Sequence, residues 1–157
     1  MNILSNRMDN IFLSDLRQII GTTITYSRAG GGVGSILLIK FSNNNRLWIW
    51  RYWELLKNNQ IIATEEDDNT AMIGKIAIAA VQLENKSVEN ISINNYNIHI
   101  TFSNGYSLFV YATRDLTNDL PNWKYSIPSK NLVYEITSNL NVEQKQWSKK
   151  QRKLGAI

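Results

Sequence analysis

The chain has 157 residues, a hydrophobic fraction of 43% and a formal net charge of +4, which is the size and composition of one domain with a contiguous core. It contains no cysteine, and this excludes disulfide bonds, thiolate zinc sites and a cysteine nucleophile. No segment reaches the roughly 18 uncharged apolar residues that cross a bilayer, and the N-terminus lacks the pattern of a secretory signal, so we expect a cytoplasmic protein without membrane contact.

The first predicted element is an amphipathic helix over residues 8–20. Its apolar residues recur every three or four positions and therefore fall on one helical face; they are Met8, Ile11, Phe12, Leu16, Ile19 and Ile20. Gly21 follows and can adopt the left-handed conformation that ends a helix. We expect the apolar face of this helix to pack on a β-sheet.

Strands are predicted at 22–27, 36–41 and 46–53, where β-branched and aromatic residues are bounded by turn residues. The glycine-rich segment Gly30–Gly34 lies between the first two. It lacks both the helix and the Lys-Ser or Lys-Thr pair of a phosphate-binding loop, so we interpret it as a flexible hairpin tip. Residues 54–60 are interpreted as a turn.

The middle of the chain is ambiguous, because residues 70–84 fit either a helix or a buried strand and Gly74 weakens an unbroken helix. Residues 141–157 carry much of the excess of Lys and Arg. We predict that they form a basic C-terminal helix or tail outside a single domain over residues 1–140. Further strands are predicted at 89–93, 96–103, 106–112, 122–127 and 132–136.

One segment is nearly repeated within the chain. FSNNNRLWIW, which begins at Phe41, recurs sixty-one residues later as FSNGYSLFVY, which begins at Phe102. Each copy predicts an antiparallel hairpin with its apolar residues in the same register. Hairpin chemistry alone explains much of this pattern, whereas the matched aromatic residues favour a duplication. We predict an α+β fold in which an antiparallel sheet is built around two similar β-hairpins, with the N-terminal amphipathic helix packed on it.

Two clusters are candidates for binding a partner. Four consecutive carboxylates form either a solvated turn or a docking patch that attracts a basic surface; they are Glu65, Glu66, Asp67 and Asp68. Four aromatic residues, with Arg46 and Arg51 close by, belong either to the core or to an exposed anchor surface; they are Trp48, Trp50, Tyr52 and Trp53. An exposed aromatic strand face together with the basic tail would also suit single-stranded nucleic acid.

The sequence offers little for catalysis. His99 is the only histidine, so a Ser-His-Asp arrangement would depend on it alone, and a metal site would need a cluster of carboxylates. We predict no catalytic residue, metal site or cofactor. A small enzyme centred on His99 is kept as an alternative.

The segments ILLIKFSNNNRLWIWRYWEL and IHITFSNGYSLFVYATRDLTNDLPNWKY resemble small bacterial immunity proteins that neutralise toxins of polymorphic or contact-dependent growth-inhibition systems. The resemblance covers residues 21–136. It implies a cytoplasmic, non-enzymatic protein that binds a cognate toxin domain and blocks its active site or substrate access. The basic balance departs from the acidic character of many nuclease inhibitors, which puts a nuclease partner in doubt. The alternative is a small nucleic-acid-binding module.

Overall fold

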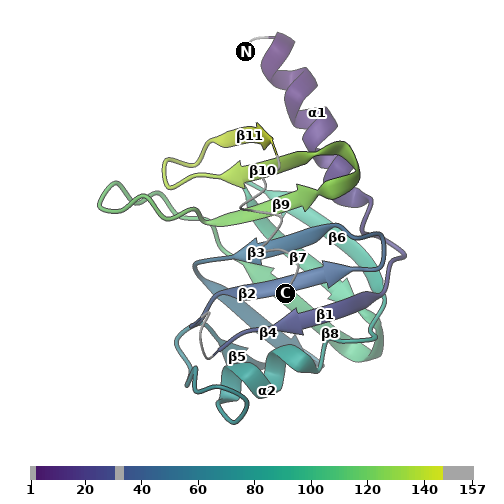
Figure 1. Ribbon diagram of the computed structural model, residues 1–157, viewed down its shortest axis with the longest axis vertical. Coiled ribbons are helices and arrows are strands. Elements are labelled where there is room, and N and C mark those ends of the chain that lie inside the picture. The colour runs from purple at the N-terminus through teal and green to yellow at the C-terminus, as the bar shows by residue number, and fades with distance from the viewer. Residues whose placement is uncertain (1–2, 31–33, 147–157) are drawn as a thin grey trace.

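The computed structural model describes residues 3–30 and 34–146, with side chains from Asn10 onward. The protein is a mixed α+β structure, mostly strands, with two antiparallel sheets and two α-helices in the described residues (Figure 1). This confirms the predicted α+β class and the antiparallel pairing. The sequence left open whether the two hairpins join in one sheet or face each other, and the structure places them in two sheets.

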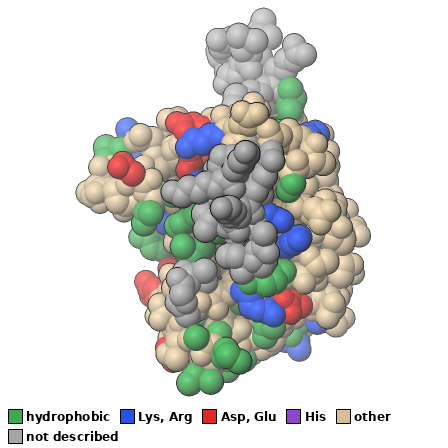
Figure 2. Space-filling view, viewed as in Figure 1, with side chains coloured by type: hydrophobic (Ala, Val, Ile, Leu, Met, Phe, Trp, Pro, Cys, Tyr) green, Lys and Arg blue, Asp and Glu red, His purple; other side chains and the backbone are tan. Residues whose placement is uncertain are grey.

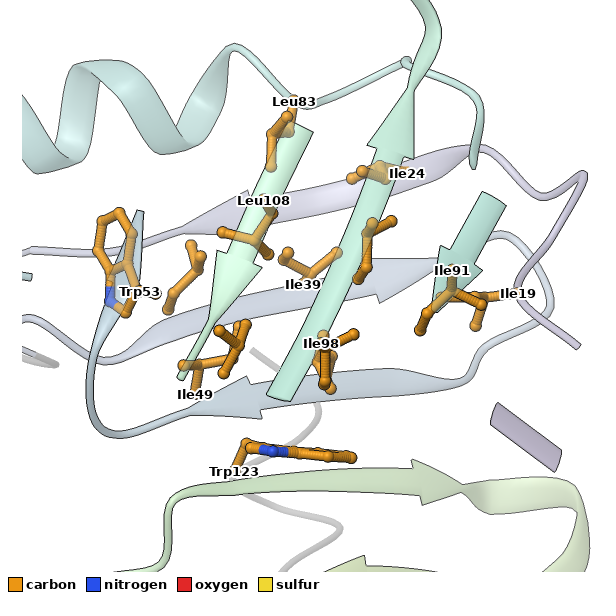
Figure 3. Packing of buried hydrophobic residues seen from close by; sticks show 14 of the residues in the cluster. Ile19, Ile24, Ile39, Ile49, Trp53, Leu83, Ile91, Ile98, Leu108 and Trp123 are labelled. Carbon is orange, nitrogen blue, oxygen red and sulfur yellow. The ribbon is translucent and has the colours of Figure 1, made fainter. Parts of the chain in front are cut away.

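The two sheets are stacked as layers, and the side chains that face each other across the gap form the core (Figures 1 and 3). The six-stranded sheet contains, in spatial order, β1 (Ile24–Arg28), β2 (Leu37–Phe41), β3 (Arg46–Ile49), β9 (Trp123–Ile127), β10 (Leu132–Ile136) and β11 (Val142–Gln146). The five-stranded sheet contains β5 (Gln60–Thr64), β4 (Trp53–Lys57), β8 (Tyr106–Val110), β7 (Asn97–Phe102) and β6 (Val88–Asn94).

Helix α1 (Ile3–Arg17) packs against the six-stranded sheet through its C-terminal half. The ring of Phe12 stacks on Trp123, with ring centroids 5.9 Å apart, and meets Tyr134 edge-on at 4.9 Å. The apolar pattern had predicted a helix over 8–20, but the helix ends earlier. Ile19 is nevertheless fully buried, because the chain keeps packing against the core as it turns after the helix.

Helix α2 (Lys75–Val81) resolves the ambiguous segment in favour of a helix. Gly74 does not interrupt this helix, because it precedes the first helical residue as an extended N-cap. A Cβ atom at Gly74 would lie 2.6 Å from the carbonyl oxygen of Asp68. The glycine is therefore required by the tight turn that leads into α2.

The order of elements repeats along the chain. The run α1-β1-β2-β3-β4-β5 is followed by α2-β6-β7-β8-β9-β10, and β11 completes the six-stranded sheet. In each half the first three strands lie in one sheet and the last two cross to the other. As a result β4 pairs with β8 of the second half, and β9 pairs with β3 of the first. The two similar hairpins, β2-β3 and β7-β8, thus lie in different sheets.

The two halves also agree in register. Residues of the two hairpins correspond at the sixty-one-residue spacing, so that Ile49 corresponds to Val110. Trp53 begins β4 opposite Val110, and Trp123 begins β9 opposite Ile49. The strand pairing shifts register at matching places, near the start of β1 and near the start of β6. We therefore call a residue of the first half equivalent to a residue of the second half when the two occupy the same place in this strand pairing.

The equivalent tryptophans, Trp53 and Trp123, tie the two layers together and are fully buried (Figure 3). The indole N–H of Trp53, in the five-stranded sheet, donates to the carbonyl oxygen of Ser35, just before β2, at 2.9 Å. The indole N–H of Trp123, in the six-stranded sheet, donates to the carbonyl oxygen of Tyr96, between β6 and β7, at 2.9 Å. A tryptophan from each sheet is thus hydrogen-bonded to the backbone of the opposite layer.

Two other predictions differ from the structure. Residues 54–57, predicted as part of a turn, belong to β4, because both Leu55 and Leu56 are buried and hide the alternation of a strand. Val142–Gln146, predicted as part of the basic helix or tail, form β11. The rest of that segment, residues 147–157, lies outside the described residues.

No helix in the described part of the chain is long and apolar enough to cross a bilayer.

Candidate functional site

A shallow concavity of about 420 Å³ lies on the outer face of the five-stranded sheet, next to the acidic loop. It brings together members of both predicted clusters, because two of the four acidic residues and two of the four aromatic residues line it. The described lining residues are Tyr52, Trp53, Glu54, Thr64, Glu65, Glu66, Tyr111 and Thr113.

The strands β4 and β8 position the aromatic wall of this concavity. Beyond the last pair of the β4-β8 ladder, the backbone N–H of Tyr111 donates to the carbonyl oxygen of Tyr52 at 2.9 Å. The next outward-facing pair along the same strands is Glu54 and Phe109. The side chains of Tyr52 and Tyr111 keep 47% and 39% of their surface exposed. Two tyrosine rings are therefore available to a ligand beside a carboxylate.

The carboxylates at the concavity are only partly satisfied within the chain. The hydroxyl of Tyr111 donates to Glu54 Oε2 at 3.2 Å, and the backbone N–H of Trp53 donates to Glu65 Oε2 at 3.0 Å. Glu66 is exposed, and no described residue donates a hydrogen bond to its carboxylate. None of the described lining residues is Lys or Arg. The concavity is therefore negatively charged.

Tyr111 is held in its protonated, donating form. Burial, the charge of Glu54 and the hydrogen bond to Glu54 all raise the pKa of the Tyr111 phenol. Its hydroxyl therefore keeps one oxygen of Glu54 in place over the neutral pH range.

The other two acidic residues brace the loop instead. Asp67 Oδ2 accepts from the backbone N–H of Thr64 at 2.7 Å, and Asp67 Oδ1 lies 3.6 Å from Lys75 Nζ. Asp68 Oδ1 accepts from the hydroxyl of Thr70 at 2.6 Å and from its backbone N–H at 3.0 Å, and these bonds lower the pKa of Asp68. The predicted four-residue patch is thus divided between the concavity and the support of the loop.

The aromatic cluster is divided as well. Trp53 has no exposed surface, so its ring belongs to the core. Trp48 and Trp50 are half-buried on the outer face of the six-stranded sheet, where their rings stack with centroids 5.8 Å apart. Figure 2 views the molecule from this side and shows hydrophobic and basic side chains intermixed on it. Lys124 Nζ lies 5.3 Å from the ring centroid of Trp50 and 3.7 Å from Glu135 Oε1.

These two places on opposite faces are equivalent. The stacked pair Trp48 and Trp50 corresponds to Phe109 and Tyr111, whose ring centroids are 6.2 Å apart. Trp48 pairs with Lys124 in β9, just as Phe109 pairs with Glu54 in β4. The same scaffold position therefore carries a lysine on one face and a glutamate on the other.

His99 extends the aromatic surface of the five-stranded sheet. Its ring lies flat against Phe109, with centroids 4.0 Å apart and an angle of 2° between the ring planes, and burial lowers its pKa. It lines a second concavity of about 270 Å³, on the other side of Phe109 and Tyr111. Within the described residues no three His, Cys, Asp or Glu side chains form a group that could hold a metal ion.

Sequence reasoning missed Glu54 and Tyr111 as site residues. Glu54 fell in a segment interpreted as a turn, so its direction on the sheet could not be read. Tyr111 had a usable signal, because it matches Trp50 in the repeated segment.

No protein-family model, curated protein or solved structure matches the chain.

Proposed function

We propose that this protein is a non-enzymatic, cytoplasmic immunity protein that binds a cognate bacterial toxin domain and blocks its active site or its access to substrate. One observation carries the proposal: the concavity joins exposed tyrosine rings to three carboxylates, Glu54, Glu65 and Glu66, on the outer face of the five-stranded sheet. Exposed aromatic side chains are typical of the anchoring centre of a protein interface, and charged groups around such a centre steer association.

The arrangement supports inhibition by occlusion rather than by chemistry. Tyr52 and Tyr111 adjoin the ends of β4 and β8 and are joined by a backbone hydrogen bond, so little conformational freedom is lost when a partner binds. The negative charge would steer a basic surface, such as a substrate-binding cleft, toward the concavity and raise the association rate. A local acidic site can act in this way even though the whole chain has a net charge of +4.

Growth rescue tests the proposal. The tagged full chain is purified from its own cells, and copurifying proteins are identified by mass spectrometry with and without nuclease treatment. Each stoichiometric partner is then expressed in an unrelated host, alone and together with this chain. We expect one partner that survives nuclease, arrests growth alone and is neutralised by co-expression. Finding no such partner contradicts the proposal, and recovery of nucleic acid instead favours the nucleic-acid-binding alternative.

The concavity itself is tested by charge reversal at Glu66. Glu66→Lys is expected to slow association with the partner roughly 3- to 10-fold at low salt and to weaken its salt dependence, because a steering charge is reversed. Glu66 is a cleaner position than Asp67, whose carboxylate braces the loop. The matched control is Glu89→Lys, an exposed glutamate on β6. Stopped-flow rates that change equally in both variants would remove the concavity from the mechanism.

A further inference from the structure

We propose that the concavity between Tyr52, Tyr111 and Glu54 binds a guanidinium group, so that the partner of this protein presents an arginine side chain to it. The proposal rests on the proposed function for the identity of the partner. Its physical basis is a comparison of the two equivalent places on the two sheets.

The six-stranded sheet shows how this scaffold holds a cation. Lys124 Nζ lies 5.3 Å from the ring centroid of Trp50, within the range of a cation–π interaction. The same ammonium group lies 3.7 Å from Glu135 Oε1. At this position an aromatic ring and a carboxylate therefore both lie beside a lysine of the same chain, and the carboxylate is also paired with Lys145.

The five-stranded sheet keeps the stacked rings of this site but not its ion pair: Thr64, which pairs with Glu54, takes the place of Glu135, which pairs with Lys124. Tyr111 occupies the place of Trp50 and is stacked with Phe109 in the same way. Glu54 occupies the place of Lys124, so the internal ammonium group is replaced by a carboxylate. The ring is retained, and an ion pair is replaced by a single carboxylate. What the site lacks, among the described residues that line it, is the positive charge.

The neighbouring carboxylates make the binding of a cation from a partner more favourable. Glu65 and Glu66 line the same concavity as Glu54, and like charges held close together repel. The tyrosine hydroxyl and the Trp53 N–H each occupy one carboxylate oxygen. Both carboxylates line the concavity together with tyrosine rings that are partly exposed. An incoming cation would relieve the repulsion and cover both rings.

The geometry favours arginine over lysine. A guanidinium group is planar, stacks on tyrosine rings and can donate to a carboxylate through two N–H groups at once. The ring of Tyr111 and the carboxylate of Glu54 lie side by side, joined by the tyrosine hydroxyl. A lysine ammonium could also lie over a ring, as Lys124 does over Trp50, but it is not planar and cannot form the paired, parallel hydrogen bonds to a carboxylate.

A titration of the full chain with L-argininamide tests the site directly. In ¹⁵N–¹H NMR spectra, we expect saturable shifts at the backbone amides of Tyr52, Glu54, Glu66 and Tyr111, with a Kd on the order of 1–10 mM for this single contact. Citrulline amide, whose ureido side chain is an uncharged isostere of the guanidinium group, should leave these amides unmoved, and lysinamide should bind at least about 3-fold more weakly. Equal shifts with citrulline amide, equal affinity for lysinamide, or shifts spread over the whole surface would overturn the proposal.

Variants assign the binding to named groups. Glu54→Gln and Tyr111→Leu should each weaken argininamide binding by roughly 5-fold or more, whereas Glu89→Gln should leave it within about 2-fold. The spectra of the free variants show whether each has kept the fold. Unchanged affinity in folded Glu54→Gln would exclude this site. If the chain binds argininamide but no toxin partner is found, the arginine site stands and the proposed function is rejected. If a toxin partner is found but argininamide does not bind, only the arginine site is rejected.

Discussion

The stacking of His99 on Phe109 shows how a single side chain responds to its neighbours. In the sequence, the only histidine of the chain shares a predicted strand face with Asn97 and Thr101, opposite Ile98 and Ile100. In the structure it lies flat on an aromatic ring on the outer face of the five-stranded sheet, and burial lowers its pKa. The alternation of the strand predicted the direction of the side chain. It could not predict the stack, because the register between β7 and β8 brings the two rings together.

His99 should make stability depend on pH. Because its pKa is lower in the folded state than in the unfolded chain, the unfolded state binds more protons below about pH 6.5. The contribution is therefore fully present above the unfolded pKa and is lost as the pH falls through the folded pKa. We expect the free energy of unfolding, measured by urea titration, to decrease between pH 7.5 and pH 5.5. His99→Phe, which keeps a stacked ring, should reduce this decrease; an identical pH dependence in the variant would contradict the prediction.

At the scale of elements, α1 is attached to the six-stranded sheet by a buried carboxylate. Asp15 is 3% exposed; its Oδ2 accepts from the hydroxyl of Tyr134 at 2.6 Å and its Oδ1 from Lys130 Nζ at 2.7 Å. Its backbone carbonyl accepts from the hydroxyl of Tyr125 at 2.9 Å. Apolar spacing predicts the side of a helix that is buried, but it does not separate a helix from a buried turn that follows it. The apolar pattern therefore continues to Ile20, beyond the C-terminal end of α1. The hydrogen bonds of Asp15 could not be predicted, because they correspond to no sequence pattern.

Removing the carboxylate should cost much more than removing its lysine partner. Asp15→Ala leaves the Tyr134 hydroxyl without its acceptor in a buried place, so we expect a loss of about 3 kcal/mol in the free energy of unfolding. Lys130 is half-exposed, and solvent screens its ion pair, so Lys130→Met should cost less than about 1 kcal/mol. Urea titrations of both variants measure the difference. Similar losses in the two variants would show that the ion pair, and not the buried hydrogen bond, holds the helix.

At the scale of the whole molecule, the exchange of strands between the halves decides the architecture. The sequence indicated both hairpins, because turn residues and alternation are local signals. It could not place them in different sheets, since that depends on pairs such as Trp53 with Val110, which are far apart in the chain. The candidate site has the same origin. Tyr52 and Tyr111 come from different halves and meet only because β4 crosses to the second sheet.

The exchange predicts that neither half folds alone. A chain cut between Asn69 and Thr70, both exposed, separates the two runs of elements and leaves each fragment with strands that lack their neighbours. We expect residues 1–69 and 70–157 to be unfolded separately and to form a 1:1 complex on mixing. Near-ultraviolet circular dichroism reports this well, because each fragment contributes one buried tryptophan, Trp53 or Trp123. A native-like signal from either fragment alone would contradict the prediction.

The opposite charges of Glu54 and Lys124 give the repeated architecture an evolutionary consequence. A chain with one repeat would need a second copy to complete both sheets, and every substitution would then appear on both faces of the symmetric pair. In a single chain that holds both repeats, each face can change independently while the inward-facing residues stay matched. Such a chain can therefore carry an acidic concavity on one face and an ion pair at the equivalent place on the other.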